Sequence, residues 1–436
     1  MLEGQFCLNF RDLPNSCEPE AALAYMTCHL LELTSKKPSL KIKRQEEEQI
    51  DEDDEFDEET LTLTLALKRP KRTSCTNNSS GGSGSNNNPN SSSLINPIGR
   101  DLSISCLLRC SRSDYGSLAS LNRGFRSVIR TGELYRLRRL SGIVEHWIYF
   151  SCNVLEWDAY DPFRRRWMAL PRMPHNECFV CSDKESLAVG TELLVFGKGI
   201  FNIVVLRYSI LTNSWSAGVE MNSPRCLFGS ASFGEKAIVA GGTDVQGNIL
   251  NSAELYNSET QTWVTLPSME KPRKMCSGVY MDNKFYVLGG MTGKSNDDLL
   301  TCGEEYDIEN GTWRVIPDMA AGLNGVSGAP PLLAVVNNQL YAANYGDKEV
   351  RKYNKESNTW VTLGRLPERS DSVNGWGIAF RACGDRLVVI GGPRVLGGGM
   401  IELHAWVPRD DSPPEWEMMD SKHSGNFVYN CAVMGC

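Results

Sequence analysis

The residues best suited to chemistry are few and scattered. His175, Cys178 and Cys181 follow one another at three-residue spacing and bring three metal-ligating side chains together, but no second pair with zinc-site spacing accompanies them. The remaining histidines are isolated. A glycine-rich stretch, Gly391–Gly399, follows a strand-like run instead of opening a helix, so a phosphate-binding loop is not expected there. We therefore expect no catalytic residue, no metal ligand and no cofactor.

Arginine is the residue type with the clearest binding role. Arginines recur, often after proline, in the segments that join repeated groups of strands. They are hypothesised to form a partial ring that receives an acidic or phosphorylated segment, because arginine binds carboxylate and phosphate in a bidentate manner. Alternatively, they cap strands or pair with neighbouring acids. The candidate target-binding residues are Arg172, Arg225, Arg273, Lys274, Arg369 and Arg394.

The elements that must position these arginines are repeated. Tryptophans recur at spacings of 47 to 50 residues, and a tyrosine precedes each by seven; the tryptophans are Trp167, Trp215, Trp263, Trp313 and Trp360. A sixth, altered unit holds Trp406 and Trp416. Strand-like runs precede each tyrosine, and three of them end in paired glycines, the last at Gly392. A period near 48 residues with about four strands per unit predicts a β-propeller.

The two ends of this repeated region predict how the propeller closes. The first unit begins with a second strand at His146–Ser151 and lacks a first strand, whereas the chain ends with an extra strand within Phe427–Cys436. Joined, they complete one blade, so we expect six blades. The glycine pairs are expected to end a strand at a crowded place, and the Tyr and Trp rings to pack between blades.

The region before residue 94 has a different composition. Glu46–Glu59 is an acidic block and Thr73–Ser93 is rich in Ser, Asn and Gly, so 1–93 is expected to be largely disordered. Lys68–Arg72 (KRPKR) is either a nuclear-import cluster or a solvated charge run. Leu61–Leu67 (LTLTLAL) resembles a plant co-repressor docking motif, although the same alternation also arises by chance or as a short strand.

Residues 94–141 show helical periodicity. Leu102, Cys106, Leu107 and Cys110 have helical spacing, and Asp101 is a plausible cap. A second apolar face follows, formed by Leu118, Leu121, Phe125, Val128 and Ile129. Such a segment is small for a self-sufficient core, so it is expected to dock against a partner or a neighbouring domain.

Together these motifs resemble a known family. The repeated unit resembles the kelch repeat over 145–436, and 94–141 resembles an F-box, although Ile98-Gly99 stands where an F-box usually opens with Leu-Pro. The order of the parts is similar to that of plant F-box/kelch-repeat proteins. This resemblance implies a substrate-recognition subunit of an SCF-type ubiquitin ligase, which binds a Skp-type adaptor and through it a cullin–RING ligase. The implied adaptor-binding residues are Ile98, Leu102, Leu107, Leu108, Leu121, Phe125 and Val128.

Composition narrows the alternatives. A net charge of −8 argues against general nucleic-acid binding, and no apolar run is long enough to cross a membrane. The start lacks the pattern of a secretory signal, so the 15 cysteines are interpreted as small buried thiols, in the nucleus or the cytoplasm. A copper oxidase would need a cluster of His and Tyr ligands, and the five scattered histidines argue against it. A sialidase would need an arginine cluster with Tyr and carboxylates, an alternative that the arginines leave open. A scaffold or transcriptional co-regulator stays open, as does the identity of the target protein.

Overall fold

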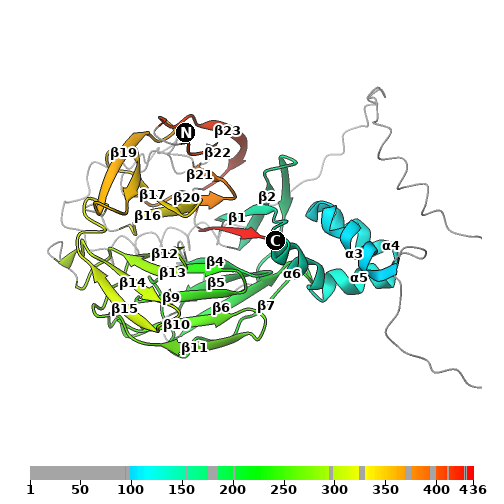
Figure 1. Ribbon diagram of the computed structural model, residues 1–436, viewed down its shortest axis with the longest axis horizontal. Coiled ribbons are helices and arrows are strands. Elements are labelled where there is room, and N and C mark those ends of the chain that lie inside the picture. The colour runs from blue at the N-terminus through cyan, green and yellow to red at the C-terminus, as the bar shows by residue number, and fades with distance from the viewer. Residues whose placement is uncertain are drawn as a thin grey trace, which may run out of the picture. The chain divides into compact units, whose positions relative to one another are not determined.

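The computed structural model describes the helical segment and most of the strand-rich region (Figure 1). The described residues are 94, 99–153, 155–174, 185–199, 202–293, 298–323, 329–368, 375–392, 399–409, 412–426, 428 and 430–436. They all belong to one contact unit, Ser93–Cys436. The acidic block, the KRPKR and LTLTLAL motifs and the His175–Cys181 cluster lie outside the described residues.

Six four-stranded antiparallel sheets form the blades of a propeller. The first three are blade 1, of β24 (Asn430–Gly435), β1 (His146–Asn153), β2 (Glu156–Asp161) and β3 (Arg166–Ala169); blade 2, of β4 (Ser186–Val189), β5 (Glu192–Lys198), β6 (Ile203–Ser209) and β7 (Ser214–Ala217); and blade 3, of β8 (Gly229–Phe233), β9 (Lys236–Ala240), β10 (Ala253–Asn257) and β11 (Thr262–Leu266). The other three are blade 4, of β12 (Ser277–Met281), β13 (Lys284–Leu288), β14 (Gly303–Asp307) and β15 (Thr312–Ile316); blade 5, of β16 (Leu332–Val336), β17 (Gln339–Asn344), β18 (Glu349–Asn354) and β19 (Thr359–Arg365); and blade 6, of β20 (Ile378–Cys383), β21 (Arg386–Gly391), β22 (Gly399–Trp406) and β23 (Glu417–Ser424).

The ring closes through the C-terminal strand. β24 pairs antiparallel with β1, with Ile148 opposite Val433, and so supplies the missing first strand of blade 1. The first strands of successive blades contact one another around the ring, in the order β24, β4, β8, β12, β16, β20 and back to β24. The prediction of six blades closed by the C-terminal strand is therefore confirmed.

The repeated aromatic residues join neighbouring strands and neighbouring blades. In five blades the Tyr lies directly opposite the Trp, as Tyr256 lies opposite Trp263 with ring centroids 4.8 Å apart. Each Trp indole also donates a hydrogen bond to the preceding blade, as Trp263 does to the carbonyl of Val219 at 3.0 Å. In blade 1 the Trp167 indole donates to Asp420 of blade 6, so the same type of contact also joins the two blades where the ring closes. The rings therefore anchor blades to one another as expected.

The glycine pairs stand where two loops approach each other. Gly241 and Gly242 have φ of 71° and 94°, and a Cβ on Gly242 would lie 2.4 Å from the carbonyl oxygen of Cys226. A Cβ on Gly241 would lie 2.4 Å from the carbonyl oxygen of Arg273, at the start of the next blade. The glycines are needed because the backbone turns left-handed under another segment.

Within the described residues 99–141, five short helices precede the propeller: α3 (Gly99–Arg109), the 3-10 helix η2 (Arg112–Asp114), α4 (Tyr115–Leu121), α5 (Arg123–Arg130) and α6 (Glu133–Leu140). We call them the helical module. Asp101 lies in the first turn of α3 instead of capping it, because the helix already begins at Gly99. Asn122 caps α5, accepting from the backbone N–H of Phe125 at 2.8 Å.

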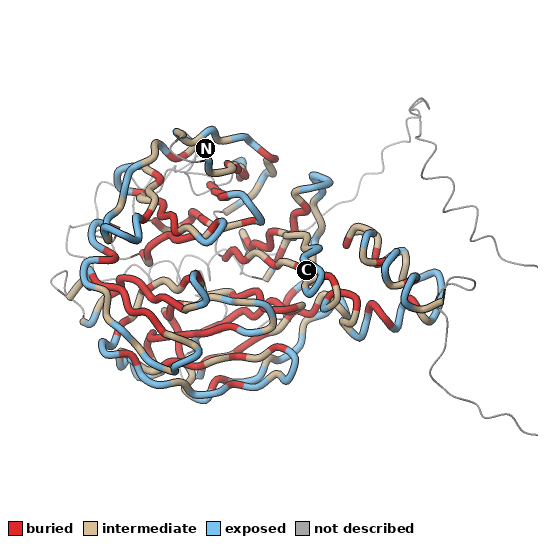
Figure 2. The backbone as a smooth tube through the Cα atoms, in the orientation of Figure 1, coloured by how far each residue is buried: buried red, intermediate tan, exposed pale blue. Residues whose placement is uncertain are grey.

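Buried residues follow the strands and one side of the helices (Figure 2). Six of the described cysteines are among them, and burial raises the pKa of the Cys276 thiol to about 11. Such cysteines are small apolar core residues with unreactive thiols.

Candidate protein-binding surfaces

The helical module divides its predicted adaptor-binding residues between core and surface. Leu107, Phe125 and Val128 are buried, so the prediction that they meet an adaptor is wrong: their side chains form the internal core of the module. Leu102 and Leu121 are 60% and 51% exposed. Leu108 is half-buried against the core, and Ile98 lies outside the described residues. The exposed leucines are the ones left free to contact a partner.

The core of the module continues into the propeller. Leu107, Phe125 and Leu134 share one buried cluster with Tyr149 of blade 1 and Leu193 of blade 2. The side chain of Arg112, in η2, enters this cluster and is 4% exposed. Its guanidinium donates to the Tyr149 hydroxyl at 2.5 Å and stands 4.1 Å from the ring of Trp147. The module is thereby docked on its neighbouring domain, as its small size predicted.

Charged contacts surround this junction. Arg138 is 1% exposed and donates to Glu145 at 2.8 Å and to the Tyr115 hydroxyl at 3.1 Å. Glu145 in turn accepts from the backbone N–H of Arg112. Arg139 pairs with Glu235 of blade 3. A charged hydrogen-bond network of this kind fixes orientation as well as holding the parts together.

The helices contact one end of the blades. We call the ends formed by the turns between first and second and between third and fourth strands the turn face, and the opposite ends the loop face. Ser113 donates to Asp161 and Asp114 pairs with Arg164, both in the β2–β3 turn. Glu235 belongs to the β8–β9 turn. Because blades are antiparallel, the loop face that carries the candidate arginines lies at the other end.

Two of the candidate arginines are sealed inside their blades. Arg225 is fully buried and donates to Glu254 at 2.7 Å, and its guanidinium also reaches the carbonyls of Gly241 and Ser252. Arg273 makes the same arrangement in blade 4 with Glu304 at 2.5 Å. Each glutamate also accepts two backbone N–H groups from the arginine's own loop. The prediction that Arg225 and Arg273 face a target is therefore wrong, because their charges are already neutralised inside the fold.

A signal in the sequence separates the buried arginines from the others. Glu254 and Glu304 stand two residues before the repeated tyrosines of their own units, whereas Leu206 occupies this position in blade 2. Arg172, in the segment that leads to blade 2, has no such glutamate and is exposed. Lys274 is half-buried, with its backbone paired to Met291. Arg369 and Arg394 lie outside the described residues.

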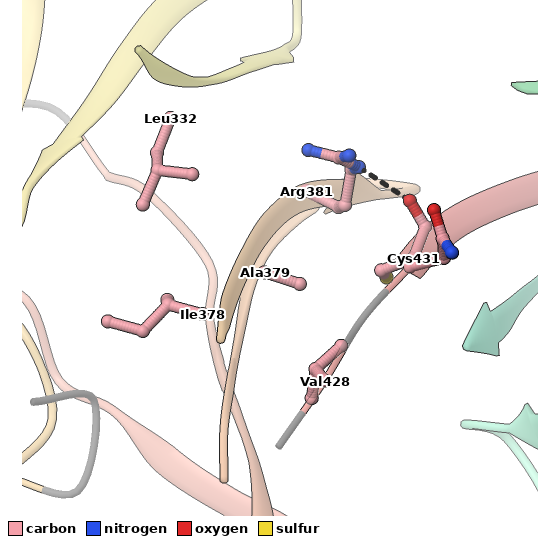
Figure 3. Close-up of a pocket in the computed structure, with 7 residues that line it drawn as sticks. Leu332, Ile378, Ala379, Arg381, Val428 and Cys431 are labelled. Atoms are coloured by element: carbon pink, nitrogen blue, oxygen red, sulfur yellow. Dashed lines mark hydrogen bonds between the residues drawn. The ribbon is translucent and has the colours of Figure 1, made fainter. Parts of the chain in front are cut away.

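One small pocket of the described residues lies where blade 6 meets blade 1. Figure 3 shows a small pocket between β20 and β24, where Arg381 donates to the carbonyl of Cys431 at 3.0 Å and joins blade 6 to blade 1. Its volume of about 10 Å³ is that of roughly one water, far below the 300 Å³ or more of a typical ligand site. Among the described residues, no three His, Cys, Asp or Glu side chains are grouped to hold a metal ion. No helix described is long and apolar enough to cross a membrane.

The fold is a six-bladed propeller with a docked helical module, and comparisons with known proteins identify its family. The Kelch motif model matches 224–270 and 272–320. The F-box/kelch-repeat protein SKIP11 of Arabidopsis thaliana is 64% identical over 79% of this chain and 76% of the relative. The F-box/kelch-repeat protein At1g74510 of the same plant is 51% identical over the full length of both chains. The chain therefore belongs to the plant F-box/kelch-repeat proteins.

Proposed function

We propose that this protein is the substrate-recognition subunit of an SCF-type ubiquitin ligase. It binds a Skp-type adaptor through the helical module and a target protein through the loop face, and it performs no chemistry itself. The adaptor links it to a cullin–RING ligase, and bound targets are ubiquitinated and degraded by the proteasome. Such a receptor acts by proximity, since it raises the local concentration of the target near the ubiquitin-charged partner.

One observation carries this proposal: the helical module is docked on the turn face, while its own exposed leucines point away from its core. Leu102 and Leu121 keep more than half of their surface in water, so a partner that covers them would bury apolar area that the fold leaves exposed. The contacts of Arg112 and Arg138 hold the module at the propeller. An adaptor on the module and a target on the loop face therefore bind without competing for the same surface.

The test is binding of the full-length chain to a purified plant Skp-type adaptor. Leu102→Lys plus Leu121→Lys is expected to abolish capture, because it places two charges in an apolar interface without disturbing the core. Val361→Lys in blade 5 is the matched control, since Val361 is 50% exposed and distant in the fold from the module. A wild-type chain that folds but fails to bind the adaptor rules out the ligase function.

The target-binding role now rests on fewer arginines. We propose that the loop face binds an acidic or phosphorylated target through Arg172, Lys274, Arg369 and Arg394. Charge reversal of Arg172 should weaken capture of a target, whereas reversal of Arg225 would unfold its blade.

KRPKR leads us to propose localisation to the nucleus as well as the cytoplasm, which imaging of a fluorescent fusion with Lys68 and Arg69 replaced by Ala would test.

A further inference from the structure

The β2–β3 turn of blade 1 carries an exposed aromatic ring where the regular blades carry an acid. Phe163 is the third residue after the repeated tyrosine and is 86% exposed. Its equivalents in blades 3, 4 and 5 are Glu259, Glu309 and Glu356. A phenyl ring in water gains nothing from the fold, and a single exposed ring is not by itself a binding site, so the rest of the turn decides whether it serves a partner.

The backbone of this turn is the same as in the regular blades. Asp161 accepts from the backbone N–H groups of Phe163 and Arg164 at 3.0 and 3.2 Å. Asp307 of blade 4 accepts in the same way from Glu309 and Asn310, both at 3.0 Å. The difference between the turns therefore lies in the side chains alone.

Arg165, two residues further on, is a second departure. It has φ of 49°, in the left-handed region that asparagine and glycine adopt at lower cost. The equivalent positions are Asn213, Gln261, Gly311 and Asn358. The contact of Arg165 with Glu417 offsets little, because the two side chains are 63% and 61% exposed. Arginine at this position is thus unfavourable for the isolated fold.

The turn lies directly beside the helical module. Arg164 pairs with Asp114 through two hydrogen bonds, at 3.0 and 2.8 Å, and Ser113 donates to Asp161 at 2.6 Å. Leu211 is the residue of blade 2 that corresponds to Phe163, and it packs against the module. A Cβ on Gly132 of the module would lie 3.3 Å from the Leu211 side chain. The module thus covers the apolar residue of one turn and leaves Phe163, in the next, open to solvent.

The turn and the module carry the same charge. Residues 99–141 contain nine arginines and three acids, Asp101, Asp114 and Glu133. Arg123, Arg126 and Arg130 are exposed on α5, at the helical spacing that places them on one side. Arg166, the first residue of β3, is exposed beside the turn. One acidic partner would complement both surfaces at once.

We propose that Phe163, Arg165 and Arg166 form a second contact with the partner of the helical module. The inference rests on the proposed function: the partner is the Skp-type adaptor, and the part of it that reaches the turn is acidic with an apolar recess for the phenyl ring. An aromatic anchor flanked by arginines is the residue combination that dominates binding energy in protein interfaces. The contact extends the adaptor interface from the helices onto blade 1.

The test restores the turn to the sequence of the regular blades. Full-length Phe163→Glu plus Arg165→Asn takes its residues from blade 5, so the fold should be unchanged or more stable. Calorimetric titration with the purified adaptor should show affinity reduced about ten-fold or more at low salt. The remaining binding should depend less on salt than that of the wild type. Val361→Glu serves as the control for a new surface acid and should bind as the wild type does.

Three results overturn the inference. If the wild-type chain does not bind the adaptor, the proposed function fails and this inference with it. If the wild type and the turn variant bind equally well while Leu102→Lys plus Leu121→Lys abolishes binding, only the inference is wrong. The third result is a turn variant that binds the adaptor as the wild type does but self-associates less in sedimentation. The turn would then contact a second copy of the chain and not the adaptor.

Discussion

Blades 3 and 4 and blade 1 each bury an arginine, but at opposite faces and from different parts of the chain. In blades 3 and 4 the buried arginine comes from the loop leading into the blade and pairs with a glutamate of the same repeat, as Arg225 does with Glu254. In blade 1 the buried arginine is Arg112, which the helical module supplies. In blades 3 and 4 the buried arginine and its glutamate both belong to the repeat, whereas in blade 1 the buried arginine comes from another part of the chain.

This difference shows where binding sites are to be sought. The two blades that the Kelch motif model matches are those in which described residues form sealed Arg–Glu pairs, and the repeated spacing of these residues serves the fold. Blade 1 departs from the pattern at Phe163 and Arg165, beside the helices. Departures from a repeat, rather than its repeated residues, mark the surfaces that are free to bind a partner.

The largest effect is expected from breaking a sealed pair. Arg273→Ala leaves the Glu304 carboxylate buried without its partner and should lower the free energy of unfolding by about 3–5 kcal/mol. Urea unfolding followed by tryptophan fluorescence measures the change. Arg172→Ala, at an exposed arginine, should change it by less than about 0.5 kcal/mol. Similar losses for both variants would contradict the division between sealed and free arginines.

Much of the division between sealed and free arginines can be predicted from the sequence. The tyrosine–tryptophan spacing predicts the blades, and the missing first strand together with the extra C-terminal strand predicts their closure. Glu254 and Glu304 stand at a fixed place before the tyrosines, from which their pairing with the arginines could be inferred. The docking of the helices was expected only in general terms. Its actual contacts join Arg112 to Tyr149 and to Met434, 322 residues further along the sequence, and follow no period. Burial of Phe125 against exposure of Leu121 likewise depends on that docking.

Removing the arginine that completes blade 1 should have the next largest effect. Arg112→Ala loses a hydrogen bond to Tyr149 and the contact with the Trp147 ring, which together are worth about 2–3 kcal/mol when buried. Unfolding in urea gives the loss, and limited proteolysis between the helices and β1 should become faster. Arg109→Ala, at an exposed residue of the same module, is the control. Unchanged proteolysis in Arg112→Ala would show that apolar packing alone holds the module.

The effect of pH on stability should differ between a buried carboxylate of blade 4 and an exposed one beside blade 1. Burial acts to raise the pKa of Glu305, but hydrogen bonds from Lys284, Arg314 and Tyr286 outweigh it, so the folded-state pKa lies below the ordinary 4.5. A depressed carboxyl pKa stabilises the fold above the unfolded-state value, and this contribution is lost as the pH falls through the folded-state value. Glu305→Gln should therefore cost about 1–2 kcal/mol at pH 7. The difference from wild type should shrink as unfolding is measured down to pH 3.

The matching variant in the contact between blades 6 and 1 is Glu417→Gln. Glu417 is 61% exposed and pairs with the equally open Arg165, so its loss should change stability by less than about 0.5 kcal/mol at every pH. A pH-dependent loss as large as that of Glu305→Gln would place the two carboxylates in the same class and remove the contrast between the blades.

The smallest effect has the opposite sign. Arg165→Asn places at φ 49° the residue that occupies the same position in blades 2 and 5, and it should raise the free energy of unfolding by about 0.5–1 kcal/mol. The reverse change, Asn358→Arg in blade 5, should lower it by a similar amount, because the backbone there has φ of 52°. Paired thermal unfolding of the two variants measures both. A loss of stability in Arg165→Asn would mean that the arginine serves the fold of blade 1 itself, and the case for a partner at this turn would then rest on Phe163 alone.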